Sequence, residues 1–178
     1  MQLKSNIQRL AASAVSLALC FVLPFVTGQV PEIGNMLCPM HIPVLLCGFL
    51  CGWQFGAVTG FVAPLFRSFI FASPPLFPQA ISMSFELLTY GLLSGMMSKI
   101  LPDKNIYVYL NLVISMLSGR AVWGLVRFII QGLGYTDFSF NLFLAGAFTN
   151  AVPGIIIQII VVPLIVIAIK RSRFWNIS

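Results

Sequence analysis

The stretch from Asn35 to Pro78, NMLCPMHIPVLLCGFLCGWQFGAVTGFVAPLFRSFIFASPPLFP, decides the fold. It contains two apolar runs on either side of the short junction GWQFG, which predicts a pair of membrane helices. Three polar residues, Asn35, His41 and Arg67, lie in surroundings that should exclude them. Because polar side chains are costly in a bilayer, a chain that keeps them usually uses them. The stretch therefore predicts a transmembrane hairpin that carries part of a binding site.

The composition of the remaining chain is that of a membrane protein. Of its 178 residues, 59% are hydrophobic and 8% are charged, and the mean hydropathy is +0.99, whereas soluble domains have about 25% charged residues. The apolar runs do not alternate with polar residues, which favours spanning helices over a β-barrel. We expect an all-α membrane protein in which residues 1–178 form a single domain within the lipid bilayer.

Turn-forming residues divide the chain into six predicted transmembrane helices. Their approximate ranges are 10–27, 38–51, 54–71, 79–97, 106–131 and 141–169. The sixth helix is expected to be interrupted at the segment from Asn150 to Gly154 and again at Pro163.

Small residues recur at helical spacing in two places. A glycine at every fourth position across the hairpin junction predicts close helix packing, at Gly48, Gly52, Gly56 and Gly60. Ala14 and Ala18 form a similar small face on the first helix. That face fits packing within the chain and docking on a partner protein equally well.

The placement of basic residues predicts the orientation in the membrane. If the N-terminus is cytoplasmic, the basic residues near helix ends all fall on the cytoplasmic side, at Lys4, Arg9, Lys99, Lys104, Lys170, Arg171 and Arg173. Both termini are then cytoplasmic, and the acidic residues Glu32 and Asp137 lie outside. The formal net charge of +6 is therefore attributed to membrane orientation and not to nucleic-acid binding.

Four ionisable residues remain inside the predicted spans: Arg67, Glu86, Arg120 and Arg127. Each costs about 2.5–3.5 kcal/mol at a helix centre unless it is paired or hydrated. Arg67 and Arg127 lie near outer helix ends and can extend toward the interface instead. Glu86 and Arg120 lie deeper, where an ion pair between them and direct contact with a ligand are both consistent with the sequence.

The polar residues gather in the outer half of the predicted bundle, which predicts a pocket that opens outward. Helical spacing places Arg120, Trp123 and Arg127 on one face, and Glu86 and Tyr90 on another. A Pro-Gly break leaves backbone groups that need a wet or ligand-filled cavity. A lone histidine at a helix start is more often a cap or a structural hydrogen-bond partner than a ligand contact. The candidate substrate-binding residues are Asn35, His41, Arg67, Glu86, Tyr90, Arg120, Trp123, Arg127 and Asn150.

The sequence does not favour catalysis. It has one histidine, and it contains neither a nucleophile elbow nor a Walker-type GxxxxGK[ST] motif. The four cysteines form no CxxC pair, and no cluster of metal-ligating residues accompanies them. We therefore expect no catalytic residues, no metal site and no ATP hydrolysis in this chain.

Several blocks of this sequence are similar to one known family, the substrate-binding S components of energy-coupling factor (ECF) vitamin transporters. The resemblance covers essentially the whole chain. It rests on the six helices, on the Ala14-x-x-x-Ala18 face, and on the blocks MHIPVLLCGFLCG, PLFRSFIFASPPLFP, SGRAVWG and AGAFTNAVPGIIIQI.

This resemblance implies a function and a set of partners. An S component binds a vitamin from outside, docks on a membrane scaffold protein (the T component) that carries two cytoplasmic ATPases, and topples to release the vitamin inside. Ala14 and Ala18 would then face the scaffold, and the Gly28–Leu37 loop would gate the site. The chain itself would need no cofactor, because ATP and Mg²⁺ belong to the ATPases. The expected location is the prokaryotic plasma membrane, as a multi-pass protein.

The blocks most resemble the pantothenate branch of that family. Pantothenate has a carboxylate, two hydroxyls, an amide and a gem-dimethyl group, which suit a pocket of Arg, Asn, Tyr and Trp side chains. A pyridoxine or hydroxymethylpyrimidine pocket, dominated by aromatic stacking and by Asn or Glu hydrogen bonds, is the alternative. A self-sufficient secondary transporter and an intramembrane enzyme are disfavoured, because the halves show no convincing repeat and no catalytic constellation is present.

Overall fold

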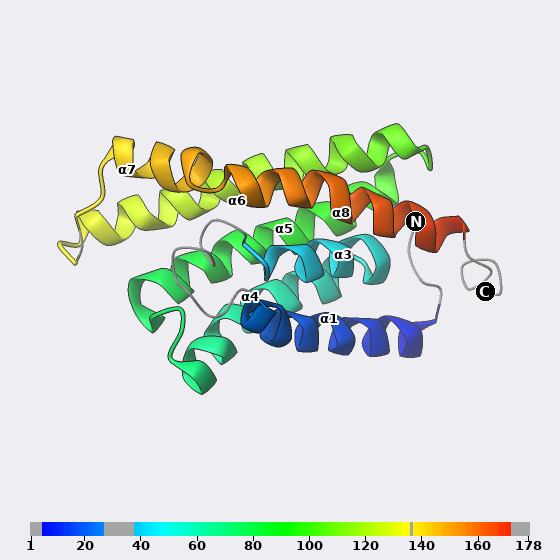
Figure 1. Cartoon of the computed structure of the whole chain (residues 1–178), viewed down its shortest axis with the longest axis horizontal. Helices are drawn as coiled ribbons and strands as arrows, with labels where there is room; N and C mark the ends of the chain where they lie inside the picture. The colour runs from blue at the N-terminus through cyan, green and yellow to red at the C-terminus, as the bar shows by residue number, and fades with distance from the viewer. Residues whose placement is uncertain (1–4, 27–37, 136, 172–178) are drawn as a thin grey trace.

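The computed structural model describes residues 5–26, 38–135 and 137–171, and within them the chain is all-helical (Figure 1). The longer helices are α1 (Asn6–Val26), α3 (His41–Cys51), α4 (Trp53–Phe71), α5 (Ile81–Ile100), α6 (Asn105–Gly132) and α8 (Val152–Arg171). Three shorter segments are η1 (Leu76–Ala80), α7 (Phe140–Leu144) and η2 (Ala145–Thr149). The predicted all-α class is confirmed for these residues.

The predicted helix boundaries hold to within a few residues, with two differences that have physical causes. α3 begins at His41 and not at residue 38, because Cys38 has a positive φ of 47° that an α-helix cannot include. The predicted break after η2 is confirmed, since α8 starts at Val152. The second predicted break is wrong, because α8 continues through Pro163.

The number of membrane spans is only partly settled by helix length and apolarity. Among the residues that the structure describes, four segments are long and apolar enough to cross a membrane: Asn6–Phe25, Trp53–Phe71, Asn105–Gly132 and Phe140–Arg171. α3 has 11 residues, which is about 16 Å of helix against a hydrocarbon core of about 30 Å. α5 has 20 residues but falls outside this set, because polar residues line its buried face. Six spans therefore remain a prediction.

Glycines hold α3, α4 and α5 in close contact, as their spacing predicts. A Cβ atom placed on Gly56 would lie 2.6 Å from the carbonyl oxygen of Gly91 on α5, and 2.7 Å from the Cα atom of Gly48 on α3. Only glycine allows backbones to approach so closely. The glycine ladder thus packs the α3–α4 hairpin against α5, the helix that carries Glu86.

The two ends of the bundle differ in charge. The start of α1, the end of α8 and the α5–α6 turn lie at one end, whereas the α4–α5 and α6–α7 connections lie at the other (Figure 1). The first end carries Lys99, Lys104, Lys170 and Arg171, and Lys170 forms an ion pair with Asp103 in the α5–α6 turn. The predicted topology also places these basic residues at one end of the bundle. The cytoplasmic location of that end remains a prediction.

Candidate functional site

α5 brings the central acidic residue into the protein interior. Ser82, Glu86, Tyr90 and Ser94 recur every four residues and are all buried on one face of this helix. That face packs against α3 and α6. Glu86 is 1% exposed, so its carboxylate depends on protein partners for stabilisation.

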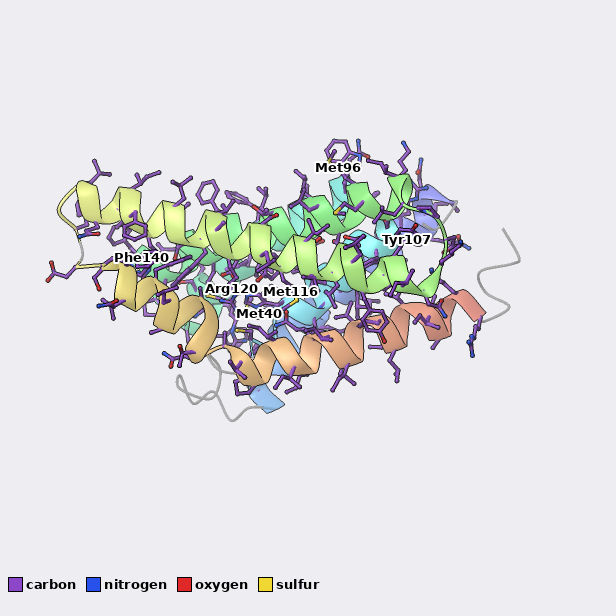
Figure 2. The ribbon with its side chains drawn as sticks, turned by 90° about the horizontal axis from the view of Figure 1, so that it is seen from above. Met40, Met96, Tyr107, Met116, Arg120 and Phe140 are labelled. Atoms are coloured by element: carbon purple, nitrogen blue, oxygen red, sulfur yellow. The ribbon has the colours of Figure 1, made fainter. Side chains whose placement is uncertain are left out.

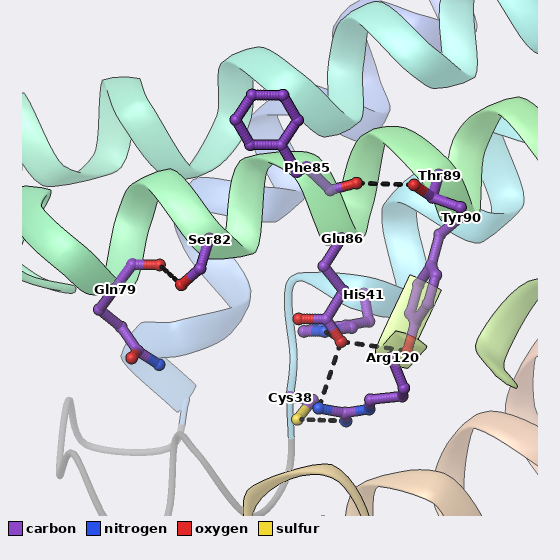
Figure 3. Close-up of polar contacts among 9 residues, drawn as sticks. All are labelled: Cys38, His41, Gln79, Ser82, Phe85, Glu86, Thr89, Tyr90 and Arg120. Carbon is purple, nitrogen blue, oxygen red and sulfur yellow. Dashed lines mark hydrogen bonds and ion pairs between the residues drawn. The ribbon is translucent and has the colours of Figure 1, made fainter. Parts of the chain in front are cut away.

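Those partners converge on one carboxylate oxygen from three helices (Figure 3). Glu86 Oε1 lies 3.2 Å from Arg120 Nη1 on α6 and 3.3 Å from His41 Nε2 on α3. The Tyr90 hydroxyl donates a hydrogen bond of 3.2 Å to the same oxygen. Arg120 also donates through Nη2 to Cys38 Sγ at 3.5 Å. We call His41, Glu86, Tyr90 and Arg120 the polar cluster.

The polar cluster contains the Glu86–Arg120 ion pair, one of the two arrangements that the sequence leaves open. Glu86 and Arg120 form an ion pair, and a buried pair of this kind holds its geometry because separating it would strand a charge. The cluster nevertheless keeps unused capacity, since His41 Nδ1 and Arg120 Nε are buried without a hydrogen-bond partner among the described residues. An ion pair and a ligand site can therefore coexist here.

An aromatic group continues the site along α6, one turn beyond Arg120. Trp123 stacks on Phe143 with ring centroids 6.2 Å apart, and meets Phe138 edge-on at 5.6 Å. Arg127 lies over the rings of Trp123 and Phe138 at 5.7 and 5.3 Å, and has no carboxylate partner in residues 5–26, 38–135 and 137–171. The predicted shared face of Arg120, Trp123 and Arg127 thus runs from the polar cluster toward the α6–α7 end.

Arg67 takes a different position from the one expected. It is 3% exposed, so it does not extend outward to the interface. It donates to the carbonyl oxygen of Phe21 on α1 at 2.9 Å and lies over the rings of Phe25 and Phe71, at 5.5 and 5.3 Å from their centroids. Within the described residues Arg67 thus contacts α1 and α4 and not the polar cluster.

Of the two remaining candidates, Asn150 lies on the surface and Asn35 lies outside the described residues. Asn150 is exposed between η2 and α8, and its backbone N–H donates to Ala145 at 2.8 Å. Asn35 and the predicted gating loop Gly28–Leu37 lie outside the described residues.

Sequence reasoning missed two polar features of the interior. Asn111 donates to the carbonyl oxygen of Ser94 at 2.9 Å and accepts from Ser115 at 3.1 Å, which joins α5 to α6. Gln158 on α8 is fully buried, and both atoms of its amide lack a partner among the described residues. The signal was available, because Gln158 is the one polar residue in the run IIIQIIVV.

The small face of α1 is open to the surroundings. Ala14 and Ala18 are both exposed, so neither is used for packing within the described chain. Ala14 also lines a groove of about 420 Å³ between α1 and α4, together with Leu17, Val58 and Val62. This exposure supports the predicted docking role, which itself stays a prediction.

Comparison with known proteins gives one family. The family model described as "ECF transporter, substrate-specific component" matches residues 8–166. This range includes every helix that contributes to the polar cluster and the aromatic group. The comparisons with curated proteins and with solved structures each gave no significant match.

Proposed function

The chain belongs to the family of ECF transporter substrate-specific components, and from this premise we propose that it captures a vitamin from outside with high affinity. Members of this family are membrane-embedded transport subunits and not enzymes. The proposed location is the prokaryotic plasma membrane, with both termini cytoplasmic and six spans.

The polar cluster is the observation that carries this proposal. A buried carboxylate surrounded by His41, Tyr90 and Arg120 is costly in a membrane protein, and such groups mark substrate pathways. The unpartnered atoms His41 Nδ1 and Arg120 Nε give the cluster an acceptor and a donor for a ligand. The ion pair with Glu86 holds the Arg120 fork in place, so that little side-chain freedom is lost on binding.

Transport energy comes from other subunits in this proposal. The sequence holds no Walker motif, so ATP and Mg²⁺ are bound by two partner ATPases. A T component links these ATPases to the chain, and the exposed Ala14 and Ala18 form the surface on which it docks. The loaded subunit then topples in the bilayer and releases the vitamin inside.

Pantothenate is the first proposed substrate, and Arg127 is the arginine best placed to bind its carboxylate. Arg120 is already paired with Glu86, and Arg67 donates to a backbone carbonyl. Arg127 is seven residues beyond Arg120, about 10 Å along α6, so an extended ligand can reach both. The rings of Trp123 and Phe138 give an apolar wall for a gem-dimethyl group.

A neutral ring vitamin is the second candidate, and the Glu86–Arg120 pair favours it. Because Arg120 is already paired with Glu86, it is less available to bind a ligand carboxylate. The neighbouring rings can stack on a pyridine or pyrimidine. Pyridoxine and hydroxymethylpyrimidine are the corresponding test ligands.

A calorimetric titration of the purified chain with a panel of B vitamins tests the proposal. One vitamin should bind far more tightly than the others, and absence of binding by all of them would contradict it. If that vitamin is pantothenate, we expect Arg127→Gln to weaken binding roughly 10- to 100-fold, as for loss of a charged hydrogen bond worth about 1.5–3 kcal/mol.

Matched variants complete this test. Pantothenol, which lacks the carboxylate, should lose little further affinity for the Arg127→Gln variant. The exposed Lys104→Gln variant serves as the control for a change in net charge. Unchanged pantothenate affinity in Arg67→Gln, Arg120→Gln and Arg127→Gln alike would rule out an arginine as the carboxylate partner.

A further inference from the structure

Gln158 has a fully buried amide without a hydrogen-bond partner in the part of the chain that the structure describes. Its exposed fraction is 0%, and neither Oε1 nor Nε2 has a hydrogen-bond partner among the described residues. A buried polar group without a partner is destabilising, and in folded proteins it needs an explanation. Gln158 has two such atoms, so a packing role alone does not account for it.

The position of Gln158 places it in the layer between α8 and the helices of the polar cluster. The buried residues of α8 are Gly154, Gln158, Val162, Pro163 and Val166, and α8 packs on both α3 and α6. Ile155 and Ile159, one before and one after Gln158 in the chain, pack against the hydrophobic cluster that contains Met40 and Met116.

Met40 and Met116 connect this layer to the polar cluster. Met40 precedes His41, and Met116 lies one turn before Arg120 on α6. Arg120, Met116 and Met40 lie together between α6 and α8 (Figure 2). Gln158 is therefore buried on α8, which packs on α3 and α6, the two helices that carry His41 and Arg120.

The unpartnered atoms around this layer have a common chemistry. Gln158 Nε2 and Arg120 Nε are donors, and Gln158 Oε1 is an acceptor. His41 Nδ1 is a second acceptor when Nε2 carries the proton toward Glu86. All four atoms are buried without a hydrogen-bond partner among the described residues.

We propose that Gln158 contacts the vitamin and selects a neutral group that both donates and accepts hydrogen bonds, such as a hydroxyl, an amide or an aminopyrimidine edge. This inference rests on the proposed vitamin-binding function. A carboxylate only accepts, so it would satisfy Nε2 and leave Oε1 facing negative charge. The neutral end of the ligand lies at Gln158, and any carboxylate lies toward Arg127.

A single substitution separates this role from a structural one. Gln158→Met keeps the volume and removes both polar atoms, so the ligand-free protein should melt at the same or a higher temperature. Binding of the vitamin selected by the wild-type chain should weaken roughly 10- to 100-fold, and the ligand-induced rise in melting temperature should shrink. Gln158→Glu retains the shape and loses the donor, and it should also bind weakly. Gln131→Met, an exposed position on α6, should change neither quantity.

The outcomes are distinct. A wild-type chain that binds no vitamin contradicts the proposed function itself. A wild-type chain that binds, together with a Gln158→Met variant of equal affinity, overturns the assignment of Gln158 alone. A Gln158→Met variant whose ligand-free form melts at a clearly lower temperature also overturns it, because the amide would then stabilise the fold and not the ligand.

Discussion

At the scale of single residues, the site is built around the buried ion pair of Glu86 and Arg120. One carboxylate oxygen contacts an arginine, a histidine and a tyrosine within 3.3 Å. Such a group is stabilised as a unit, so each member depends on the others. The residues that hold the site together are therefore also residues that can touch the ligand.

Removing one charge of the pair should destabilise the protein more than removing both. In Glu86→Gln the Arg120 cation stays buried and uncompensated, and we expect a loss of roughly 3–5 kcal/mol of stability. In the double variant Glu86→Gln/Arg120→Met neither charge of the pair remains, so much of that loss should be recovered. Thermal unfolding in detergent measures both.

Tyr90→Phe is the matched control for this comparison, because it removes one hydrogen bond and leaves the charges paired. Its expected cost is about 1 kcal/mol. Additive losses in the double variant would show that Glu86 and Arg120 are not energetically coupled.

The sequence can predict contacts between site residues on the same helix, but not contacts with residues far away in the chain. Helical spacing was sufficient to pair Glu86 with Tyr90 and Trp123 with Arg127, because those partners lie on one helix. It could not show that Arg67 turns toward the α1 backbone, since the acceptor is 46 residues away. Gln158 was overlooked because a lone amide in an apolar run has no partner on its own helix.

At the scale of helices, the α4–α5 seam sets the position of Glu86. Gly56 and Gly91 face each other across it, and a Cβ atom on Gly56 has no space beside the carbonyl oxygen of Gly91. A shift of α5 would carry Glu86 away from His41 and Arg120. The glycines therefore position the site without contacting it.

Gly91→Ala should lower stability and weaken ligand binding together. The added methyl forces α4 and α5 apart, and overpacking of this kind costs about 1–3 kcal/mol. Gly132→Ala is the matched control, because no atom lies within 4 Å of its Cβ position at the end of α6. That control should be neutral or stabilising by up to about 1 kcal/mol. A Gly91→Ala variant as stable as Gly132→Ala would show that the seam tolerates separation.

Helix existence was easier to predict than helix termination. Long apolar runs define α1, α4 and α6 to within a few residues, because membrane helices need length and apolarity. Prolines were a weaker guide. Pro163 lies within α8 without ending it, since neighbouring helices and local adjustments can satisfy the freed carbonyl group.

At the scale of the whole molecule, the basic end predicts a testable orientation. Lys104 lies in the α5–α6 turn and Tyr135 in the α6–α7 connection, and these two connections lie at opposite ends of the bundle (Figure 1). A membrane-impermeant maleimide should label Tyr135→Cys in intact cells and Lys104→Cys only after the cells are opened. All four native cysteines, Cys20, Cys38, Cys47 and Cys51, are buried, so the unmodified chain gives the background. Labelling in the reverse order would invert the topology.

The exposed small face of α1 separates capture of the vitamin from its transport. Ala14 and Ala18 are both exposed, and Ala14 borders the groove between α1 and α4, so there is room for a larger side chain at either position. Ala14→Trp and Ala18→Trp should therefore leave stability and vitamin affinity unchanged, while uptake by cells that also contain the T component and both ATPases is lost. Val113→Trp, at an exposed position on α6, controls for a large side chain in contact with lipid and should transport normally. If the alanine variants lose binding in the purified subunit, the face serves internal packing. If the purified chain alone moves vitamin into liposomes, the partners are not needed for transport. The proposed docking role of α1 is then wrong, because it requires that transport depend on those partners.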